Sequence, residues 1–190
     1  MSTYALVVPT TGDRPYLPDL IAASGLPPER VIVVLTADVQ LDLDATIVTD
    51  LGPPNIQRWW NTGIRAAGCE HVALFNDDLT IPAGLIGAMS QRLDETGASI
   101  CYVGTDAPVP CLTGWAFMLS ITHGVRPDER FAWYYGDNDL HRQAIAGRGI
   151  THVPTVITHH HPGESTRSRA DLHALTEADR LTFARKWGDG

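Results

Sequence analysis

The stretch Val72-Ala73-Leu74-Phe75-Asn76-Asp77-Asp78 decides the fold, because an apolar run changes abruptly into an amide and two carboxylates. Such a run predicts a buried strand, and Pro82 soon afterwards ends regular pairing. The carboxylates therefore lie at the carboxyl end of a strand, where ligand crevices form in open α/β sheets. Carboxylates there can hold a hard divalent cation, and the cation can hold phosphate oxygens. A solvated Asp-rich turn is the alternative.

Strand and helix patterns alternate around this stretch, which predicts an α/β fold with a mostly parallel sheet flanked by helices. The expected strands are residues 4–8, 31–35, 45–48, 72–75, 99–103, 115–121 and 151–158. The expected helices are residues 17–24, 56–67, 82–96, 139–146 and 174–187. No internal repeat or low-complexity linker interrupts them, so 190 residues predict one domain with a substantial core.

The composition argues against broad nucleic-acid binding and favours a reducing compartment. The net charge is -8, Lys186 is the only lysine and no Lys/Arg run occurs, which argues against a broad nucleic-acid groove. Cys69, Cys101 and Cys111 lack C-x-x-C spacing, which favours buried thiols in a reducing compartment over disulfides or a zinc site. No signal peptide or apolar run of roughly 20 residues occurs, so we expect a soluble cytoplasmic protein without a membrane span.

Two familiar phosphate-binding signatures are missing. The sequence has neither G-x-G-x-x-G after its first strand nor G-x-x-x-x-G-K-[ST] anywhere. A phosphate group would therefore need a metal ion rather than a glycine loop, which favours a metal-binding role for Asp77 and Asp78.

A second acidic cluster is Tyr134-Tyr135-Gly136-Asp137-Asn138-Asp139. Asp137 follows a glycine and is crowded by aromatic residues, which tend to raise the pKa of a carboxyl and make it a reasonable general base. Asp139 falls where the N-cap of the helix expected from residue 139 would lie, so capping is one interpretation of this residue.

A third cluster, His159-His160-His161, directly follows an expected strand. Adjacent strand residues alternate between faces, so at most two of these rings can face one site. A neutral imidazole is a ready ligand for a divalent transition metal, whereas a surface histidine run is the alternative. Trp115, if it lies near the carboxylates, can stack against a sugar ring or base, although a core position is also common for tryptophan.

Together these residues resemble the glycosyltransferases of the GT-A fold, and within them family 2, from Tyr4 to about His161. Each matching piece is weak alone, but their order and spacing are specific. Residues 5–15 resemble the opening strand and Pro-Thr-x-x-Arg-Pro loop, 60–68 the Arg-Asn-x-Gly-Ile helix, 72–82 the strand ending in Asp-x-Asp, 113–118 the Gly-rich acceptor-side strand, and 131–142 the Phe, Glu-Asp-x-Asp-Leu and Arg run.

The resemblance implies a role for each matching residue. Asp78 is expected to bind Mn²⁺ or Mg²⁺, with one of His159 and His161 completing the metal shell. Asp137 is the expected catalytic base. The residues expected to bind the donor are Pro9, Thr10, Thr11, Arg14, Asp38, Asn61, Asn76, Asp77 and Trp115.

Three departures from the family pattern bear on these roles. Asn76 replaces the usual first Asp of the metal motif, and Gly136 stands where Glu is common. Leu35-Thr36-Ala37-Asp38 replaces the usual Asp-Asp-Gly-Ser, which removes the acidic residue expected to read a uracil base. Asp38 is the nearest substitute, so the identity of the nucleotide stays open.

The resemblance implies metal-dependent, inverting transfer of a hexose or pentose from a nucleoside diphosphate sugar to an acceptor hydroxyl. Residues 1–82 would form the nucleotide-sugar half, and residues 83–190 the acceptor half with a C-terminal helix that pairs subunits in a homodimer or covers the acceptor. Bacterial and phage enzymes of this type suggest a glycan or a hydroxylated DNA base as acceptor, in the cytoplasm of a bacterium or an infected host. The alternatives are an inactive sugar-nucleotide-binding module, a nucleotidyltransferase and a metal-dependent hydrolase.

Overall fold

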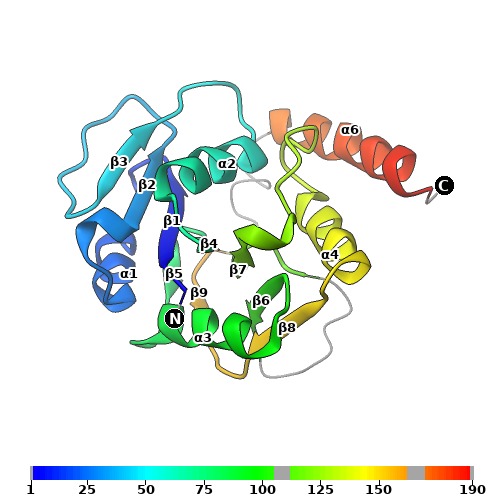
Figure 1. The fold of residues 1–190 in the computed structure, drawn as a ribbon. Coiled ribbons are helices and arrows are strands. Elements are labelled where there is room, and N and C mark those ends of the chain that lie inside the picture. Colours follow the sequence, from blue (N-terminus) through cyan, green and yellow to red (C-terminus); the bar gives the residue numbers. More distant parts are fainter. Residues whose placement is uncertain (1, 105–111, 162–169, 189–190) are drawn as a thin grey trace.

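A computed structural model describes residues 2–104, 112–161 and 170–188 and contains a mixed, mostly parallel sheet of seven strands (Figure 1). The strand order is β3-β2-β1-β4-β7-β6-β8, and only β7 runs antiparallel to its neighbours. This arrangement confirms the predicted α/β class. The strands are β1 (Tyr4–Thr10), β2 (Val31–Leu35), β3 (Thr46–Thr49), β4 (His71–Phe75), β6 (Ile100–Val103), β7 (Ala116–Ser120) and β8 (Ile150–Val153).

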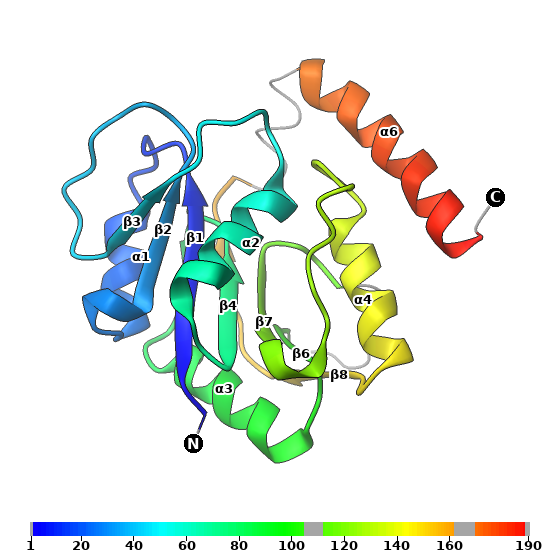
Figure 2. The ribbon, with the colours of Figure 1, turned by 45° about the horizontal axis from the view of Figure 1, so that its top comes forward.

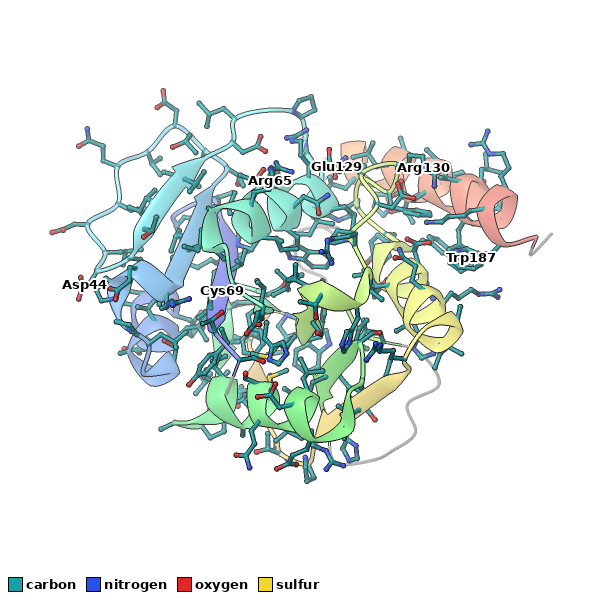
Figure 3. The ribbon with its side chains drawn as sticks, viewed as in Figure 1. Asp44, Arg65, Cys69, Glu129, Arg130 and Trp187 are labelled. Atoms are coloured by element: carbon teal, nitrogen blue, oxygen red, sulfur yellow. The ribbon has the colours of Figure 1, made fainter. Side chains whose placement is uncertain are left out.

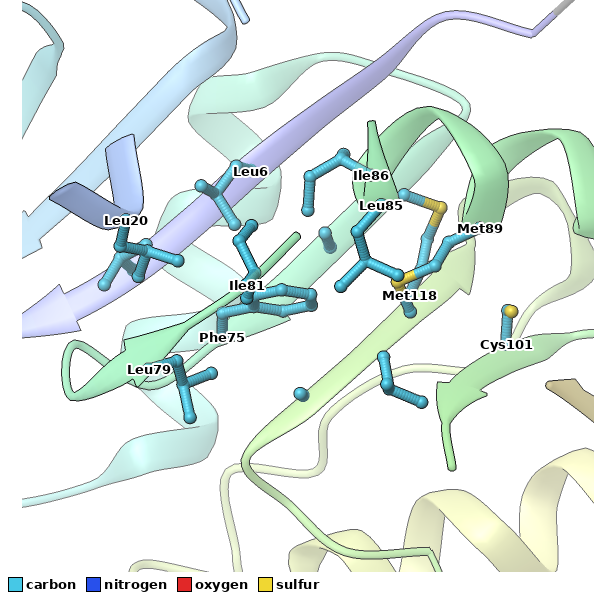
Figure 4. Close-up of a cluster of buried hydrophobic side chains, with 14 of the residues drawn as sticks. Leu6, Leu20, Phe75, Leu79, Ile81, Leu85, Ile86, Met89, Cys101 and Met118 are labelled. Atoms are coloured by element: carbon cyan, nitrogen blue, oxygen red, sulfur yellow. The ribbon is translucent and has the colours of Figure 1, made fainter. Parts of the chain in front are cut away.

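Helices cover both faces of the sheet, because alternate side chains of each buried strand point to opposite sides. One apolar cluster packs beneath α1 and α3, with Leu6, Phe75 and Met118 among its members (Figure 4). The other packs beneath α2 and α4, and α6 lies beyond α4, away from the sheet (Figure 2). The helices are α1 (Leu17–Ser24), α2 (Ile56–Ala67), α3 (Leu85–Thr96), α4 (Gly136–Ala146) and α6 (Ala170–Trp187), with 3₁₀ turns η1 (Pro28–Arg30) and η2 (Ile121–His123).

Close packing of α2 on β1 depends on Gly63, where a Cβ would lie 2.2 Å from Cγ1 of the buried Val7. We expect Gly63→Ala to destabilise the fold by about 1–3 kcal/mol, because the added methyl overpacks the core. The matched control is Gly87→Ala on α3, where a Cβ would meet only the end of Tyr4, at 3.3 Å. Urea unfolding of both variants checks this, and a Gly63→Ala variant as stable as the control would contradict it.

The strand predicted over residues 151–158 is confirmed for residues 151–153 and is wrong in its extent beyond them. Strand β8 ends at Val153, because Pro154 cannot donate a hydrogen bond to a ladder. The chain then forms the short strand β9 (Thr158–His159), which pairs antiparallel with β5 (Leu79–Thr80). This small second sheet joins the residues after β4 to the histidine cluster.

The N-cap interpretation of Asp139 is also wrong. Helix α4 begins at Gly136 and its N-cap is Tyr135, which adopts the left-handed conformation with φ 61°. Asp139 is fully buried inside the helix, where Trp187 Nε1 donates to it at 2.9 Å and Lys186 Nζ lies 2.7 Å away. The residue therefore anchors α6 rather than capping α4.

Other expectations concern cysteines and membranes. Cys69 and Cys101 are buried and free, as expected, whereas Cys111 lies outside the described residues. Among the described helices, none has both the length and the apolar character that crossing a bilayer requires.

Candidate functional site

A cavity of about 740 Å³ opens at the carboxyl ends of β1, β2 and β4, where three parallel strands deliver their following loops to one edge. Most of the residues selected from the sequence line it together. They are Pro9, Thr10, Thr11, Arg14, Asn76, Asp77, Asp78, Trp115, Asp137, His159 and His161.

Two of the expected donor-binding residues do not line this cavity. Asp38 is exposed in a bend after β2. Asn61 instead donates its amide hydrogens to the backbone oxygen of Pro127 at 3.0 Å and to Glu129 Oε1 at 2.9 Å. The cavity lining does not support a donor-binding role for Asp38 or Asn61, which stays a prediction, and Asn61 fixes the segment that precedes α4.

Asp77 is held by the end of β1. Its Oδ2 accepts a hydrogen bond from Thr10 Oγ1 at 2.6 Å. Burial raises the pKa of Asp77 to about 6, opposed by the Thr10 hydrogen bond and reinforced by the neighbouring charge of Asp78. Two carboxyl groups thus lie together in a setting that favours a compensating positive charge.

The pairing of β5 with β9 brings Asp78 to the histidine cluster. Asp78 is 5% exposed, and its Oδ1 lies 3.2 Å from Nε2 of His159. That distance suits an ion pair, but the geometry is not that of a hydrogen bond, and Asp78 Oδ1 has no hydrogen-bond partner among the described residues. Burial lowers the pKa of His159, against the opposing influence of Asp78, and so favours the neutral ring that metals bind.

These two atoms fit a divalent cation, since a buried carboxylate oxygen that lacks a hydrogen-bond partner among the described residues faces a ring nitrogen. Within residues 2–104, 112–161 and 170–188, no three Asp, Glu, His or Cys side chains form a metal-binding group. A cation held by Asp78 and His159 would therefore take further ligands from substrate phosphates and water, a common arrangement for Mg²⁺.

The other two histidines both contact Tyr16, but of these two only His161 lines the cavity. His161 lines the cavity, with its Nε2 3.3 Å from Tyr16 Oη and its backbone N–H donating to Asp78 Oδ2 at 3.2 Å. His160 stacks on the Tyr16 ring at a centroid distance of 3.9 Å and bonds through Nε2 to Thr80 Oγ1 at 2.9 Å. Of the two histidines that line the cavity, His159 has the more direct approach to Asp78.

Asp137 lies in the first turn of α4 and lines the same cavity. Its Oδ2 accepts a hydrogen bond from Gly114 N–H at 3.0 Å, and its Oδ1 accepts one from Asn138 N–H at 2.9 Å. Burial nevertheless raises the pKa of Asp137, with the backbone hydrogen bonds opposing the rise. The arrangement fits a fixed carboxyl group that accepts a proton.

Sequence reasoning missed an aromatic and amide-bearing wall. The cavity is also lined by Gln57, Trp59 and Trp60 of α2 and by Trp133 and Tyr134 of the segment before α4. In the sequence, the helical spacing of Trp59 and Trp60 favours a core position for both rings. The ring of Trp133 meets Trp59 edge-on at 6.0 Å, which joins the two parts of the wall.

Helix α6 holds this wall through Asp179, which is 2% exposed. The Asp179 carboxylate accepts hydrogen bonds from three successive backbone N–H groups, of Ala132 at 2.9 Å, Trp133 at 2.7 Å and Tyr134 at 2.8 Å. Because Trp133 and Tyr134 line the cavity, the C-terminal helix positions the wall next to Asp137.

Ion pairs also hold the first residues of this segment. Lys186 Nζ lies 2.8 Å from Asp128 Oδ2, and Glu129 lies 3.9 Å from Arg65 of α2. Figure 3 labels Arg65 on α2, Glu129 and Arg130 on the connecting segment, and Trp187 on α6. The segment is thus tied to helices on both of its sides.

We expect Asp179→Asn to lower the free energy of unfolding by roughly 1.5–3 kcal/mol, because an amide cannot accept all three hydrogen bonds. The matched control is Glu177→Gln, which removes the same charge from an exposed Glu–Arg180 pair on the same helix. Thermal unfolding should show a clear loss for Asp179→Asn and little change for the control. Equal melting temperatures would contradict the proposed role of Asp179.

Several glycosyltransferases of known structure are similar to this chain. Glucosyl-3-phosphoglycerate synthase from Mycobacterium tuberculosis, with Mn²⁺, UDP-glucose and phosphoglyceric acid, superposes with a TM-score of 0.68 at 13% identity, over 98% of this chain and 80% of that chain. The mannosyltransferase PcManGT from Pyrobaculum calidifontis, with GDP-mannose and Mn²⁺, gives 0.61 at 17% identity, over 82% and 55%. Residues 1–349 of S. aureus TarS with UDP-GlcNAc give 0.59 at 13%, over 80% and 56%.

The chain has the GT-A fold. At these identities the likeness is one of fold, and the chain spans little more than half of the TarS fragment and of PcManGT. No protein-family model matches the chain, and no curated protein matches it in sequence.

Proposed function

We propose that the protein is a metal-dependent, inverting glycosyltransferase that moves a hexose or pentose from a nucleoside diphosphate sugar to an acceptor hydroxyl. The proposal rests on one observation, that a candidate cation site and a candidate base line the same cavity. Asp78 and His159 offer a cation site on one side, and Asp137 offers a base on another. The GT-A fold, shared with enzymes whose structures hold Mn²⁺ and nucleotide sugars, supports it.

In the proposed reaction the acceptor oxygen bonds to the anomeric carbon as the bond from that carbon to the diphosphate breaks. Asp137 takes the proton of the acceptor hydroxyl, and displacement from the opposite face inverts the anomeric centre. A Mn²⁺ or Mg²⁺ ion held by Asp78 and His159 would supply positive charge against the leaving diphosphate. Arg14 lines the cavity with a guanidinium suited to phosphate oxygens.

Charge in the cavity disfavours a nucleotidyltransferase. Arg14 is the only Lys or Arg among the described residues that line it, whereas binding a triphosphate usually requires a basic loop. The net charge of -8 for the whole chain favours a glycan over DNA as the acceptor, since DNA binding requires positive charge.

The proposal is tested by incubating the protein with Mn²⁺ and a panel of UDP- and GDP-sugars. Separate arms add glycan acceptors and DNA that contains hydroxymethylated bases. We expect release of the nucleoside diphosphate together with a mass increase of one acceptor class by one sugar. A donor that binds but is never turned over with any acceptor would support the inactive-module alternative. Hydrolysis that no acceptor accelerates would support the hydrolase.

The raised pKa of Asp137 predicts how the group titrates. Because burial favours the protonated form in the folded state, the carboxyl contributes stability below its unfolded pKa, and that contribution is lost as the pH rises through the folded pKa. A protonated Asp137 cannot accept the proton of the acceptor hydroxyl, so transfer should be lost as the pH falls. The midpoint of that loss should lie above 3.8, the ordinary pKa of Asp. Carbon-13 NMR titration of the carboxyl groups, assigned with Asp137→Asn, checks this. A midpoint at or below 3.8 would contradict it.

A further inference from the structure

Three polar atoms on one helix are buried without a hydrogen-bond partner among the described residues. They are Oε1 of Gln57 and the indole Nε1 atoms of Trp59 and Trp60, in the first turns of α2. The exposed fractions of these residues are only 1%, 8% and 2%, and all three residues line the cavity. Buried polar groups in native proteins nearly always have partners, so three neighbouring exceptions beside one cavity call for a ligand.

The Gln57 carboxamide is placed directly against the start of α4. A Cβ built on Gly136 would lie 1.9 Å from Gln57 Nε2 and 2.3 Å from its Cδ. The carboxamide therefore occupies the space that any side chain at position 136 would need. Since Asp137 is the next residue, Gln57 lies beside the group proposed to receive the acceptor's proton.

This location determines which part of the donor would lie nearby. The acceptor hydroxyl must reach Asp137 and the anomeric carbon at the same time, so the transferred sugar lies next to Asp137. The hydroxyl groups of that sugar would then reach Gln57 and Trp60, which belong to the wall of the cavity. These two residues are three apart on α2 and share a helix face.

The chemistry of the wall matches hydroxyl groups. An amide oxygen accepts a hydrogen bond, and an indole N–H donates one. A sugar hydroxyl does both, so one acceptor and two donors on α2 complement a ring that carries several hydroxyls. The aromatic faces of the same tryptophans suit the apolar C–H side of a sugar ring.

We propose that Gln57 and Trp60 form a subsite that recognises hydroxyl groups of the transferred sugar, and that Gly136 keeps the subsite open for the Gln57 carboxamide. The proposal rests on the proposed donor specificity. It assigns Gln57 and Trp60 a role in selecting the sugar, separate from binding of the nucleotide and the metal.

The test compares a nucleotide with its own sugar derivative. Calorimetry with Mn²⁺ gives the Kd of UDP and GDP and of the UDP- and GDP-sugars for the wild type, Gln57→Leu and Trp60→Phe. We expect each variant to weaken binding of the nucleotide sugar by about 5- to 30-fold, the equivalent of one or two lost hydrogen bonds. Binding of the bare nucleotide should stay unchanged.

Two further variants separate recognition from packing. Gly136→Ala leaves Gln57 in the sequence but displaces its carboxamide, so it should produce the same selective loss. Gln91→Leu on α3, where Gln91 is exposed and bonds to Glu95, is the matched control and should behave as wild type.

The outcomes distinguish this proposal from the proposed function. Wild-type protein that binds the nucleotide and its sugar derivative equally well, or variants that lose both equally or neither, would overturn the sugar subsite alone. Wild-type protein that binds no nucleotide or nucleotide sugar would overturn both proposals. A selective loss in all three cavity variants, with an unaffected control, would support the subsite.

Discussion

Replacing Asp78 with Ala is expected to abolish metal-dependent donor binding. Asp78 Oδ1 is buried, lacks a hydrogen-bond partner among the described residues and lies 3.2 Å from His159 Nε2. Loss of a residue that only orients a metal-binding side chain lowers metal affinity by about 10- to 100-fold. Loss of the ligand itself should therefore raise the Kd of the donor with Mn²⁺ by at least about 100-fold, measured by calorimetry.

The matched control for this prediction is Asp42→Ala. It removes the same charge from an exposed position outside the cavity and should leave the donor Kd unchanged. Circular dichroism must show both variants folded, because Asp78 also accepts the backbone N–H of His161. Unaltered donor binding by Asp78→Ala would show that Asp78 does not hold the metal, and an equal loss with Asp42→Ala would show that the effect is not specific to the cavity.

Replacing Asp137 with Asn is expected to stop transfer and spare donor binding. An amide of the same shape still accepts a backbone hydrogen bond but cannot take a proton at neutral pH. Loss of general-base help should reduce kcat by roughly 10²- to 10⁴-fold. The donor Kd should change little, because Asp78 and His159 are untouched. Rates of nucleoside diphosphate release with acceptor, and the donor Kd, give the two numbers.

The control for this second prediction is Asp44→Asn, a change at an exposed residue that does not line the cavity (Figure 3). Its kcat and donor Kd should equal those of the wild type. Near-normal turnover by Asp137→Asn would show that another group accepts the proton. A parallel loss of donor binding would instead make Asp137 a donor ligand.

The first half of the fold could be predicted from the sequence because its signals are local. The β-branched run Val31–Leu35 and the helix from Ile56 to Ala67, ended by Gly68, were predicted with the bounds the structure has. The second half depends on contacts between distant segments. Pro154 ends β8, but the short strand β9 forms only by pairing with β5, and no periodicity in the sequence predicts a two-residue strand.

The candidate site was predictable only where residue type carries the chemistry. Carboxylates and histidines at strand ends indicated the cavity, and the structure brings Asp77, Asp78, Asp137 and His159 to it. Asp38 was selected because it is the nearest acidic residue along the chain to the position expected to read the base. The backbone after β2 leaves its side chain exposed to solvent. The wall formed by α2 was missed because helical spacing of tryptophans looks the same for a core face and for a cavity face.

The contacts by which α6 holds the wall of the cavity could not be predicted from the sequence either. Asp179 lies 45 or more residues after the backbone groups that it binds, so no local pattern connects them. Lys186 reaches Asp128 over a similar separation. Only the folded chain shows that its last helix holds the wall of the cavity.

Calorimetric titration of the wild-type protein with a panel of nucleoside diphosphate sugars, with and without Mn²⁺, tests whether the cavity binds a donor through a metal ion. We expect at least one donor to bind, and its binding to require the metal. Folded protein that binds no donor, or binds one equally well when Mn²⁺ is absent and chelator is present, would contradict the metal-dependent donor site at Asp78 and His159.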